Sequence, residues 1–250
     1  MLHVAWGVAL AAFAFPFDTP SRRALRIRRW SARLLRILAV HLTVEGVPPR
    51  AGAPAMMVAN HVSWLDIFAI NAVRPARFVA KSEVRGWPVI GWLCARVGAL
   101  FIERVRRHHV AQINTCVATA LAAGDTFAVF PEGTTTAGDV MLPFHASLLE
   151  PALACGTMLH PVAIRYTRGD GSLCREADYA GDKSLLDSLL AMITQPRIEV
   201  VLVFLTPLGT AGTHRRALAR EAERAIATAL RLPWPSKGAG KVADPRAAAR

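Results

Sequence analysis

The sequence predicts an α/β fold, in which helices flank and largely cover a mixed β-sheet, with an N-terminal membrane-associated helical segment. Short apolar runs alternate with helical patterns over residues 39–232, which is typical of an α/β domain. Hydrophobic residues make up 53% of the chain and charged residues 19%, so it is more apolar and less charged than an ordinary soluble protein. Residues 1–38 differ from the rest, being apolar at first and then rich in arginine.

The N-terminal segment joins an apolar run to a basic one. Residues 2–17 are almost wholly apolar, but this run of 16 residues is shorter than the roughly 20 that span a bilayer. Residues 1–36 contain seven arginines and a single acidic residue, Asp18. Basic sequence that also carries Leu, Ile and Trp is typical of a helix at a membrane surface. A solvated basic helix packed on the domain is the alternative, and a signal peptide is disfavoured because no positive charge precedes the apolar run.

The domain at residues 39–232 is predicted to alternate strands and helices. We expect strands at residues 39–45, 55–59, 77–80, 99–102, 126–130, 158–166 and 198–206. We expect helices at residues 21–38, 63–71, 90–97, 111–123, 146–154, 184–192 and 213–230. Residues 233–250 are rich in Pro, Gly, Ala and charged residues and show no helical or strand periodicity, so we expect a disordered tail.

Charge and cysteine usage limit the function classes. A net charge of +12 indicates an anionic partner, either nucleic acid or a lipid surface. Aromatic residues make up only 7%, which gives little support to a base-stacking surface, so we expect no nucleic-acid partner. The four cysteines have no paired spacing, which disfavours a disulfide framework and a zinc site: Cys94, Cys116, Cys155 and Cys174. We expect reduced thiols in a protein that faces the cytosol, and no metal.

The segment NHVSWLD at residues 60–66 contains the first candidate catalytic pair, His61 and Asp66. On one continuous helix, residues five apart would not face each other. They can meet if His61 lies in the turn after the strand at residues 55–59 and Asp66 lies in the first turn of the next helix. Asp66 would then accept the Nδ1 proton and leave Nε2 free to act as a base. The alternative is structural, because Ser63 and Asp66 also match a capping box.

Two further stretches carry polar side chains at strand ends. The segment FPEGTTT at residues 130–136 follows a strand and turns sharply, so Glu132 and the threonine hydroxyls could bind a glycerol hydroxyl or phosphate; an ordinary polar loop is the alternative. Arg104 follows the strand at residues 99–102, and Lys81 follows the strand at residues 77–80. Both side chains could contact phosphate, although a single surface cation is more often solvated.

Taken in order, four blocks resemble those of the glycerolipid acyltransferase family, whose bacterial type member is the 1-acyl-sn-glycerol-3-phosphate acyltransferase. They are residues 60–66, 98–104, 130–134 and 159–163 (LHPVA), and the resemblance covers roughly residues 36–207. It implies that His61 is the general base and Asp66 its partner. It also implies that Arg104 binds phosphate.

The resemblance assigns further residues to the substrate. Glu132 and Gly133 match the block that contacts the glycerol phosphate of the acceptor, and Thr134 and Thr135 extend that block. Lys81 stands where the family commonly has a basic residue. Pro161 matches the block that shapes the acyl side of the site.

One departure bears on the acceptor, because many family members read FPEGTRS where this chain has Thr135 in place of the arginine. The resemblance implies transfer from acyl-CoA or acyl-carrier protein to 1-acyl-sn-glycerol 3-phosphate, giving phosphatidic acid, without a further cofactor. The alternative acceptors are lyso-ornithine lipid, another lysophospholipid and glycerol 3-phosphate. The alternative from another function class is a non-catalytic lipid-binding module. The expected partners are membrane lipid and acyl-carrier protein, at the cytoplasmic face of a bacterial inner membrane.

Overall fold

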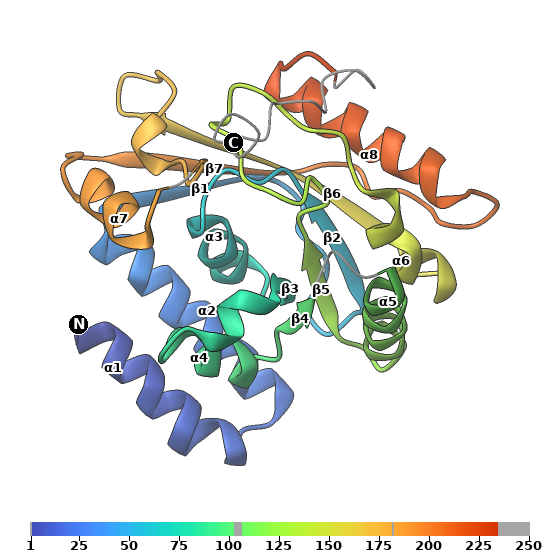
Figure 1. The fold of residues 1–250 in the computed structure, drawn as a ribbon, viewed down its shortest axis with the longest axis horizontal. Helices are drawn as coiled ribbons and strands as arrows, with labels where there is room; N and C mark the ends of the chain where they lie inside the picture. Colours follow the sequence, from blue (N-terminus) through green and yellow to red (C-terminus); the bar gives the residue numbers. More distant parts are fainter. Residues whose placement is uncertain (1, 103–106, 182, 235–250) are drawn as a thin grey trace, which may run out of the picture.

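A computed structural model describes residues 2–102, 107–181 and 183–234 (Figure 1). Its seven strands form one sheet in the order β1-β7-β6-β2-β5-β3-β4. Neighbouring strands are parallel except β6 and β7, which are antiparallel, so β1 and β7 run against the other five. The mixed α/β sheet expected from the sequence is confirmed. The bounds are β1 Val40–Gly46, β2 Ala55–Ala59, β3 Arg77–Lys81, β4 Leu100–Ile102, β5 Thr126–Val129, β6 Leu159–Arg168 and β7 Ile198–Phe204.

The helices fall close to the predicted ranges. The α-helices are α1 Leu2–Ala9, α2 Pro20–Ile37, α3 Leu65–Val73, α4 Ile90–Arg96, α5 Arg107–Ala122, α6 Glu150–Ala154, α7 Leu185–Ile193 and α8 Arg215–Leu230. Shorter turns are the π-helix η1 Leu10–Ala14 and the 3-10 turns η2 Phe15–Phe17, η3 Ser82–Gly86, η4 Ala146–Leu149 and η5 Arg175–Ala177. The tail expected to be disordered lies outside the described residues from position 235 onward.

Helices cover both faces of the sheet, which accounts for the continuous apolar strands. Met57 and Ala59 of β2 pack into a core with residues of α2, α3 and α7. The alternate residues Met56 and Val58 pack into a second core with residues of α5, α6 and α8. Figure 1 shows α8 and α3 on opposite sides of the sheet. Because β2 is buried on both faces, its end is held rigidly, and this is where the candidate site begins.

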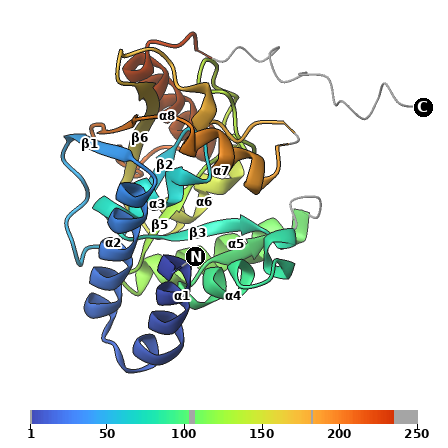
Figure 2. The same ribbon diagram turned by 90° about the vertical axis from the view of Figure 1, so that its left-hand side faces the viewer.

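The N-terminal segment folds back on itself, with α1 and α2 side by side (Figure 2). The rings of His3 and Trp30 stack at 4.6 Å between the two helices, and the Thr19 hydroxyl caps α2 by accepting the Arg22 N–H. Leu35, in the last turns of α2, is buried in the domain core, whereas Phe13 and Phe17 are 77% and 86% exposed. None of the helices in the described part of the chain combines the length and the apolar character that crossing a bilayer requires.

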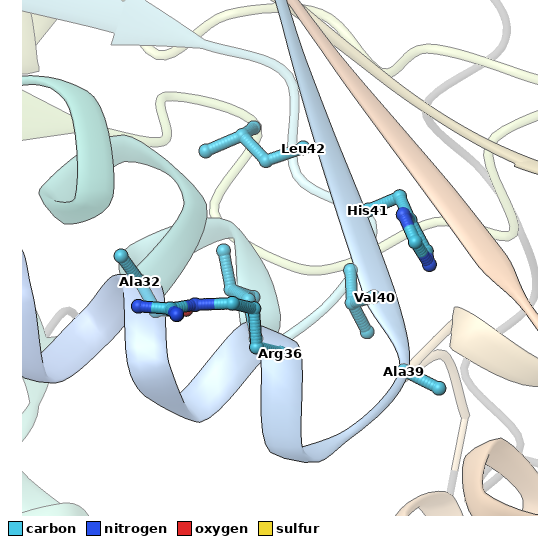
Figure 3. A pocket seen from close by; sticks show the side chains of 7 residues that line it. Ala32, Arg36, Ala39, Val40, His41 and Leu42 are labelled. Atoms are coloured by element: carbon cyan, nitrogen blue, oxygen red, sulfur yellow. The ribbon is translucent and has the colours of Figure 1, made fainter.

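A hollow of about 290 Å³ lies where α2 meets β1, at the edge of the sheet. Its lining comes from Ala32, Leu35, Arg36, Ala39, Val40, His41 and Leu42. His41 and Leu42 project to opposite sides of β1 (Figure 3). Two strands, β7 and β6, separate β1 from β2 in the sheet order. The hollow is therefore apart from the predicted catalytic segment, and its lining contains none of the predicted site residues.

Candidate active site

The loops that follow β2 and β5 leave the sheet side by side, because these strands are parallel neighbours with Val58 opposite Val129. Asn60 fixes the first of these loops. Its side-chain amide donates to the Ile164 carbonyl at 2.9 Å, and its side-chain oxygen accepts from the Ile164 N–H at 2.8 Å. The asparagine thus continues the pairing with β6 through its side chain, which frees the main chain to turn at His61.

His61 and Asp66 meet across the turn-to-helix junction that the sequence predicts. Asp66 lies in the first turn of α3, and its Oδ2 is 2.8 Å from His61 Nδ1. The Asp66 side chain is 0% exposed, while that of His61 is 20% exposed. Among the described residues, none forms a hydrogen bond with His61 Nε2. The imidazole therefore has one nitrogen held by a buried carboxylate and the other free for a substrate.

Asp66 also organises the turn itself. Its Oδ2 accepts the main-chain N–H groups of Val62 at 2.8 Å and Ser63 at 3.0 Å. The Ser63 hydroxyl accepts from the Leu65 N–H rather than from that of Asp66, so the reciprocal half of a capping box is not formed. The structural and catalytic interpretations of Asp66 are thus compatible, because one carboxylate shapes the turn and orients the imidazole.

The loop after β5 supports His61 from the opposite side. The Phe130 ring stacks on the imidazole with centroids 4.0 Å apart and an interplanar angle of 9°. Glu132 is only 4% exposed. Its Oε1 accepts the main-chain N–H of His61 and its Oε2 accepts that of Leu142, both at 2.8 Å. Glu132 therefore links the two loops.

Burial makes Glu132 an unusual carboxyl group. Desolvation raises its pKa to about 7, against the opposing effect of the two N–H donors from Leu142 and His61. The negative charges of Asp66 and Glu223 raise it further. The protonation state of Glu132 consequently changes near neutral pH, in direct contact with the main chain of His61.

The threonine-rich part of this loop is fastened to the chain after β6. Gly133 has a φ of +81°, a left-handed conformation that favours glycine. The Thr135 hydroxyl donates to the Tyr179 carbonyl at 2.5 Å, and the Tyr179 N–H donates to the Val62 carbonyl at 2.9 Å. Thr134 is exposed. At position 135 this chain therefore has a hydrogen bond that holds the loop, where many relatives are expected to carry an arginine.

Sequence comparisons agree with this geometry. A family model described as Acyltransferase matches residues 41–165. A lyso-ornithine lipid O-acyltransferase from Pseudomonas aeruginosa is 40% identical over 234 residues, covering 91% of this chain and 89% of that protein. A 1-acyl-sn-glycerol-3-phosphate acyltransferase from Neisseria meningitidis is 33% identical over 208 residues, covering 83% and 81%. This chain belongs to the acyltransferase family.

The fold of this acyltransferase is also that of a solved structure. The 1-acyl-sn-glycerophosphate (LPA) acyltransferase PlsC from Thermotoga maritima superposes with a TM-score of 0.69 at 22% identity, covering 92% of both chains. The glycerolipid acyltransferase resemblance found in the four sequence blocks is confirmed.

The remaining predicted residues of the acyltransferase stand as follows. Lys81 ends β3 opposite Ile102 of β4, and its side chain lies outside what the structure describes. Arg104 lies outside the described residues, so its predicted phosphate contact stays a prediction. Pro161 is buried in β6, where it is opposite Val58 and its carbonyl accepts the Leu205 N–H at 3.0 Å.

Sequence reasoning missed three residues that hold the His61 segment. Asn60 and Phe130 lie inside the blocks at residues 60–66 and 130–134. A polar amide and an aromatic ring at the ends of buried strands are signals that could have identified them. Tyr166 donates its hydroxyl to Asp66 Oδ1 at 2.7 Å from a position 100 residues away. It lies in an ordinary apolar strand, and no local pattern marks it.

Proposed function

We propose that this acyltransferase moves a fatty acyl group from a thioester donor to the free hydroxyl of a lyso-ornithine lipid at a membrane surface. The observation that carries the transfer chemistry is the placement of His61 Nδ1 2.8 Å from the buried Asp66 carboxylate, with Nε2 unpaired among the described residues. A histidine held in this way can accept a proton at its free nitrogen.

The proposed reaction needs no covalent enzyme intermediate. His61 Nε2 removes the proton of the acceptor hydroxyl as the oxygen attacks the thioester carbonyl carbon. The tetrahedral intermediate carries an oxyanion that main-chain N–H groups would stabilise, and it collapses by breaking the carbon–sulfur bond. The imidazolium then returns the proton to the leaving thiolate. Asp66 stabilises the imidazolium while it lasts, since the two groups are in direct contact.

Two observations support the lyso-ornithine acceptor. The relative from Pseudomonas aeruginosa that carries this name is 40% identical and aligns over nearly the whole chain. Thr135 supplies a neutral hydroxyl, already bonded to the Tyr179 carbonyl, where many family members have a guanidinium that suits phosphate.

The second candidate acceptor is 1-acyl-sn-glycerol 3-phosphate, with phosphatidic acid as the product. It is favoured by the Neisseria meningitidis relative of that name, at 33% identity. Arg104 and Lys81 would bind its phosphate, as the family resemblance implies. Acyl-CoA and acyl-carrier protein remain the proposed donors for either acceptor.

The N-terminal helices supply the proposed membrane contact. The exposed apolar residues Leu2, Phe13 and Phe17 belong to α1 and the turns after it, next to the arginine-rich α2. An apolar surface beside a basic one fits the acyl and headgroup layers of an anionic leaflet. We propose binding at the cytoplasmic face of the inner membrane, where a lysolipid can enter laterally.

An acceptor panel tests the function. The purified protein in anionic vesicles is given lyso-ornithine lipid or 1-acyl-sn-glycerol 3-phosphate, each with acyl-CoA and with acyl-carrier protein. We expect acyl transfer, with a higher kcat/KM for the lyso-ornithine lipid. A higher value for the glycerophosphate would favour the second acceptor, and vesicle binding without transfer to any lysolipid would favour a lipid-binding module.

Vesicle flotation tests the membrane contact without removing α2, whose Leu35 belongs to the core. The double variant Phe13→Glu/Phe17→Glu places charges where the apolar side chains would enter the bilayer, so we expect a large loss of binding. Val47→Glu is the control, because Val47 is a similarly exposed apolar residue that follows β1. Equal binding by the double variant and the parent would contradict the proposed contact.

A further inference from the structure

The buried carboxylate of Asp66 has a fourth hydrogen bond, which the transfer chemistry above does not use. Its Oδ2 faces the His61 imidazole and two main-chain N–H groups. Its Oδ1 accepts the hydroxyl of Tyr166 at 2.7 Å. Both oxygens of this carboxylate are thus occupied, and the tyrosine is the partner that approaches from the sheet.

Tyr166 cannot act on a substrate directly. It lies in β6 opposite Val200 of β7, and its side chain is among the largest that are fully buried. Burial raises the pKa of its phenol well above the ordinary value, with the Asp66 charge adding to the effect, so the hydroxyl stays protonated and remains a donor. Phenylalanine would fill the same space without needing a buried acceptor.

We propose that Tyr166 is a positioning residue, which fixes the Asp66 carboxylate through Oδ1 so that Oδ2 stays directed at His61 Nδ1. The inference rests on the proposed function of His61 as the base. A carboxylate can rotate about its bond to Cβ, and a donor on the far oxygen restricts that rotation. The same bond draws charge away from Oδ2, which moderates how strongly Asp66 stabilises the imidazolium.

Removal of the hydroxyl alone should therefore have two measurable effects. In Tyr166→Phe the carboxylate is less firmly held, so we expect kcat to fall about tenfold with little change in the acceptor KM. The charge on Oδ2 is also less dispersed, so Asp66 stabilises the imidazolium more strongly. The acid limb of kcat/KM should consequently move to higher pH.

Other titratable groups surround this pair and must be separated from it. Glu132, from the loop after β5, contacts the main chain of His61 and has a pKa raised to about 7 by burial. Cys174 donates its main-chain N–H to the Tyr166 carbonyl, and burial raises the pKa of its thiol, which is therefore neutral over the acid limb. The comparison should be repeated in a Glu132→Gln background, where the shift caused by Tyr166→Phe should persist.

A titration independent of turnover completes the test. The protein is labelled at histidine, the His61 resonance is assigned with His61→Ala, and its pKa is measured by NMR in the parent and in Tyr166→Phe. Val200→Ala is the control, because it removes core volume opposite Tyr166 without touching Asp66; it should lower stability and leave the His61 titration and the pH limb unchanged.

Fluorinated tyrosine strengthens the hydrogen bond to Asp66, whereas Tyr166→Phe removes it, and it keeps the tyrosine side chain in the core. The chain has only two tyrosines, so 3-fluorotyrosine in a Tyr179→Phe background labels Tyr166 alone. A more acidic phenol is a stronger donor and draws more charge from Oδ2, so the acid limb of kcat/KM should move to lower pH. An unchanged pH limb and an unchanged His61 titration in both proteins would overturn the positioning role. Absence of acyl transfer by the parent would overturn the proposed function instead, and the titration would still decide the role of Tyr166.

Discussion

Asp66 and Glu132 are two buried carboxyl groups on either side of His61, and they do different work. Asp66 contacts the imidazole, whereas Glu132 contacts the main-chain N–H of the same residue. In the proposed mechanism Asp66 therefore acts on the proton chemistry of His61, whereas Glu132 holds the main chain of His61 in place. The difference shows that a buried carboxyl group in a matched block can bond to the main chain of the candidate base rather than to its side chain.

Asp66→Asn should have the largest effect on this comparison. Asparagine keeps the size of the side chain but lacks the negative charge that stabilises the imidazolium, so we expect kcat to fall about 10³-fold or more. Steady-state kinetics in vesicles measures it, with the exposed Asp139→Asn as the control. A loss of only a fewfold would contradict the partnership of Asp66 with His61.

Glu132 should instead show itself in the pH dependence of stability. Its folded pKa of about 7 lies above the 4.5 of an ordinary glutamate, so the folded protein binds more protons between those values. Its contribution to the free energy of unfolding therefore falls as pH rises from about 4.5 to 7, by about 3 kcal/mol in total.

Urea unfolding of the parent and of Glu132→Gln at pH 5 and pH 8 measures this change. Glutamine places an NH₂ group against one main-chain N–H donor and so loses one hydrogen bond. This loss of stability does not depend on pH. The parent should thus lose stability relative to Glu132→Gln as the pH rises. A constant difference between the two proteins would contradict the raised pKa.

The kinetics of Glu132→Gln separate support of His61 from binding of the acceptor. Because Glu132 holds the His61 N–H, we expect kcat to fall about tenfold while the acceptor KM changes less than about twofold. If Glu132 bound the acceptor, as the resemblance implies, KM would rise instead. Saturation curves for both substrates distinguish the two results.

The last prediction concerns the acceptor preference and Thr135, which lies in the same loop as Glu132. Thr135→Arg restores the cation that many family members have, at the loss of the hydrogen bond to the Tyr179 carbonyl. We expect the ratio of kcat/KM for 1-acyl-sn-glycerol 3-phosphate to that for lyso-ornithine lipid to rise about tenfold. Thr134→Arg adds the same charge at the exposed neighbour and should change the ratio less.

Local patterns predicted the fold well, because each strand and helix leaves its own periodic signal. The strand at residues 55–59 was predicted in place. The π-helical turn at Leu10–Ala14 was not predicted, since an apolar run has the same composition in either kind of helix.

The site was predicted less completely, for a physical reason. His61 and Asp66 are close in sequence, so turn geometry brought them together before the fold was known. The resemblance implies that Glu132 contacts the acceptor, and this stays a prediction. Its hydrogen bonds to the main-chain N–H groups of His61 and Leu142 were not predicted, because a block shows which residue types occur but not where a side chain points. Tyr166 reaches Asp66 only through the pairing of β6 with β2, which no local pattern records.

Acyl transfer by His61→Ala tests the central claim most directly. The variant is compared with the parent in the same anionic vesicles, with circular dichroism and flotation as checks that it folds and binds. We predict that it folds and binds vesicles like the parent. We also predict a loss of at least about 10³-fold in kcat, because Tyr166, the other side chain bonded to Asp66, is a hydrogen-bond donor and cannot replace the imidazole as the base. Turnover at the parental rate would contradict the assignment of His61 as the base.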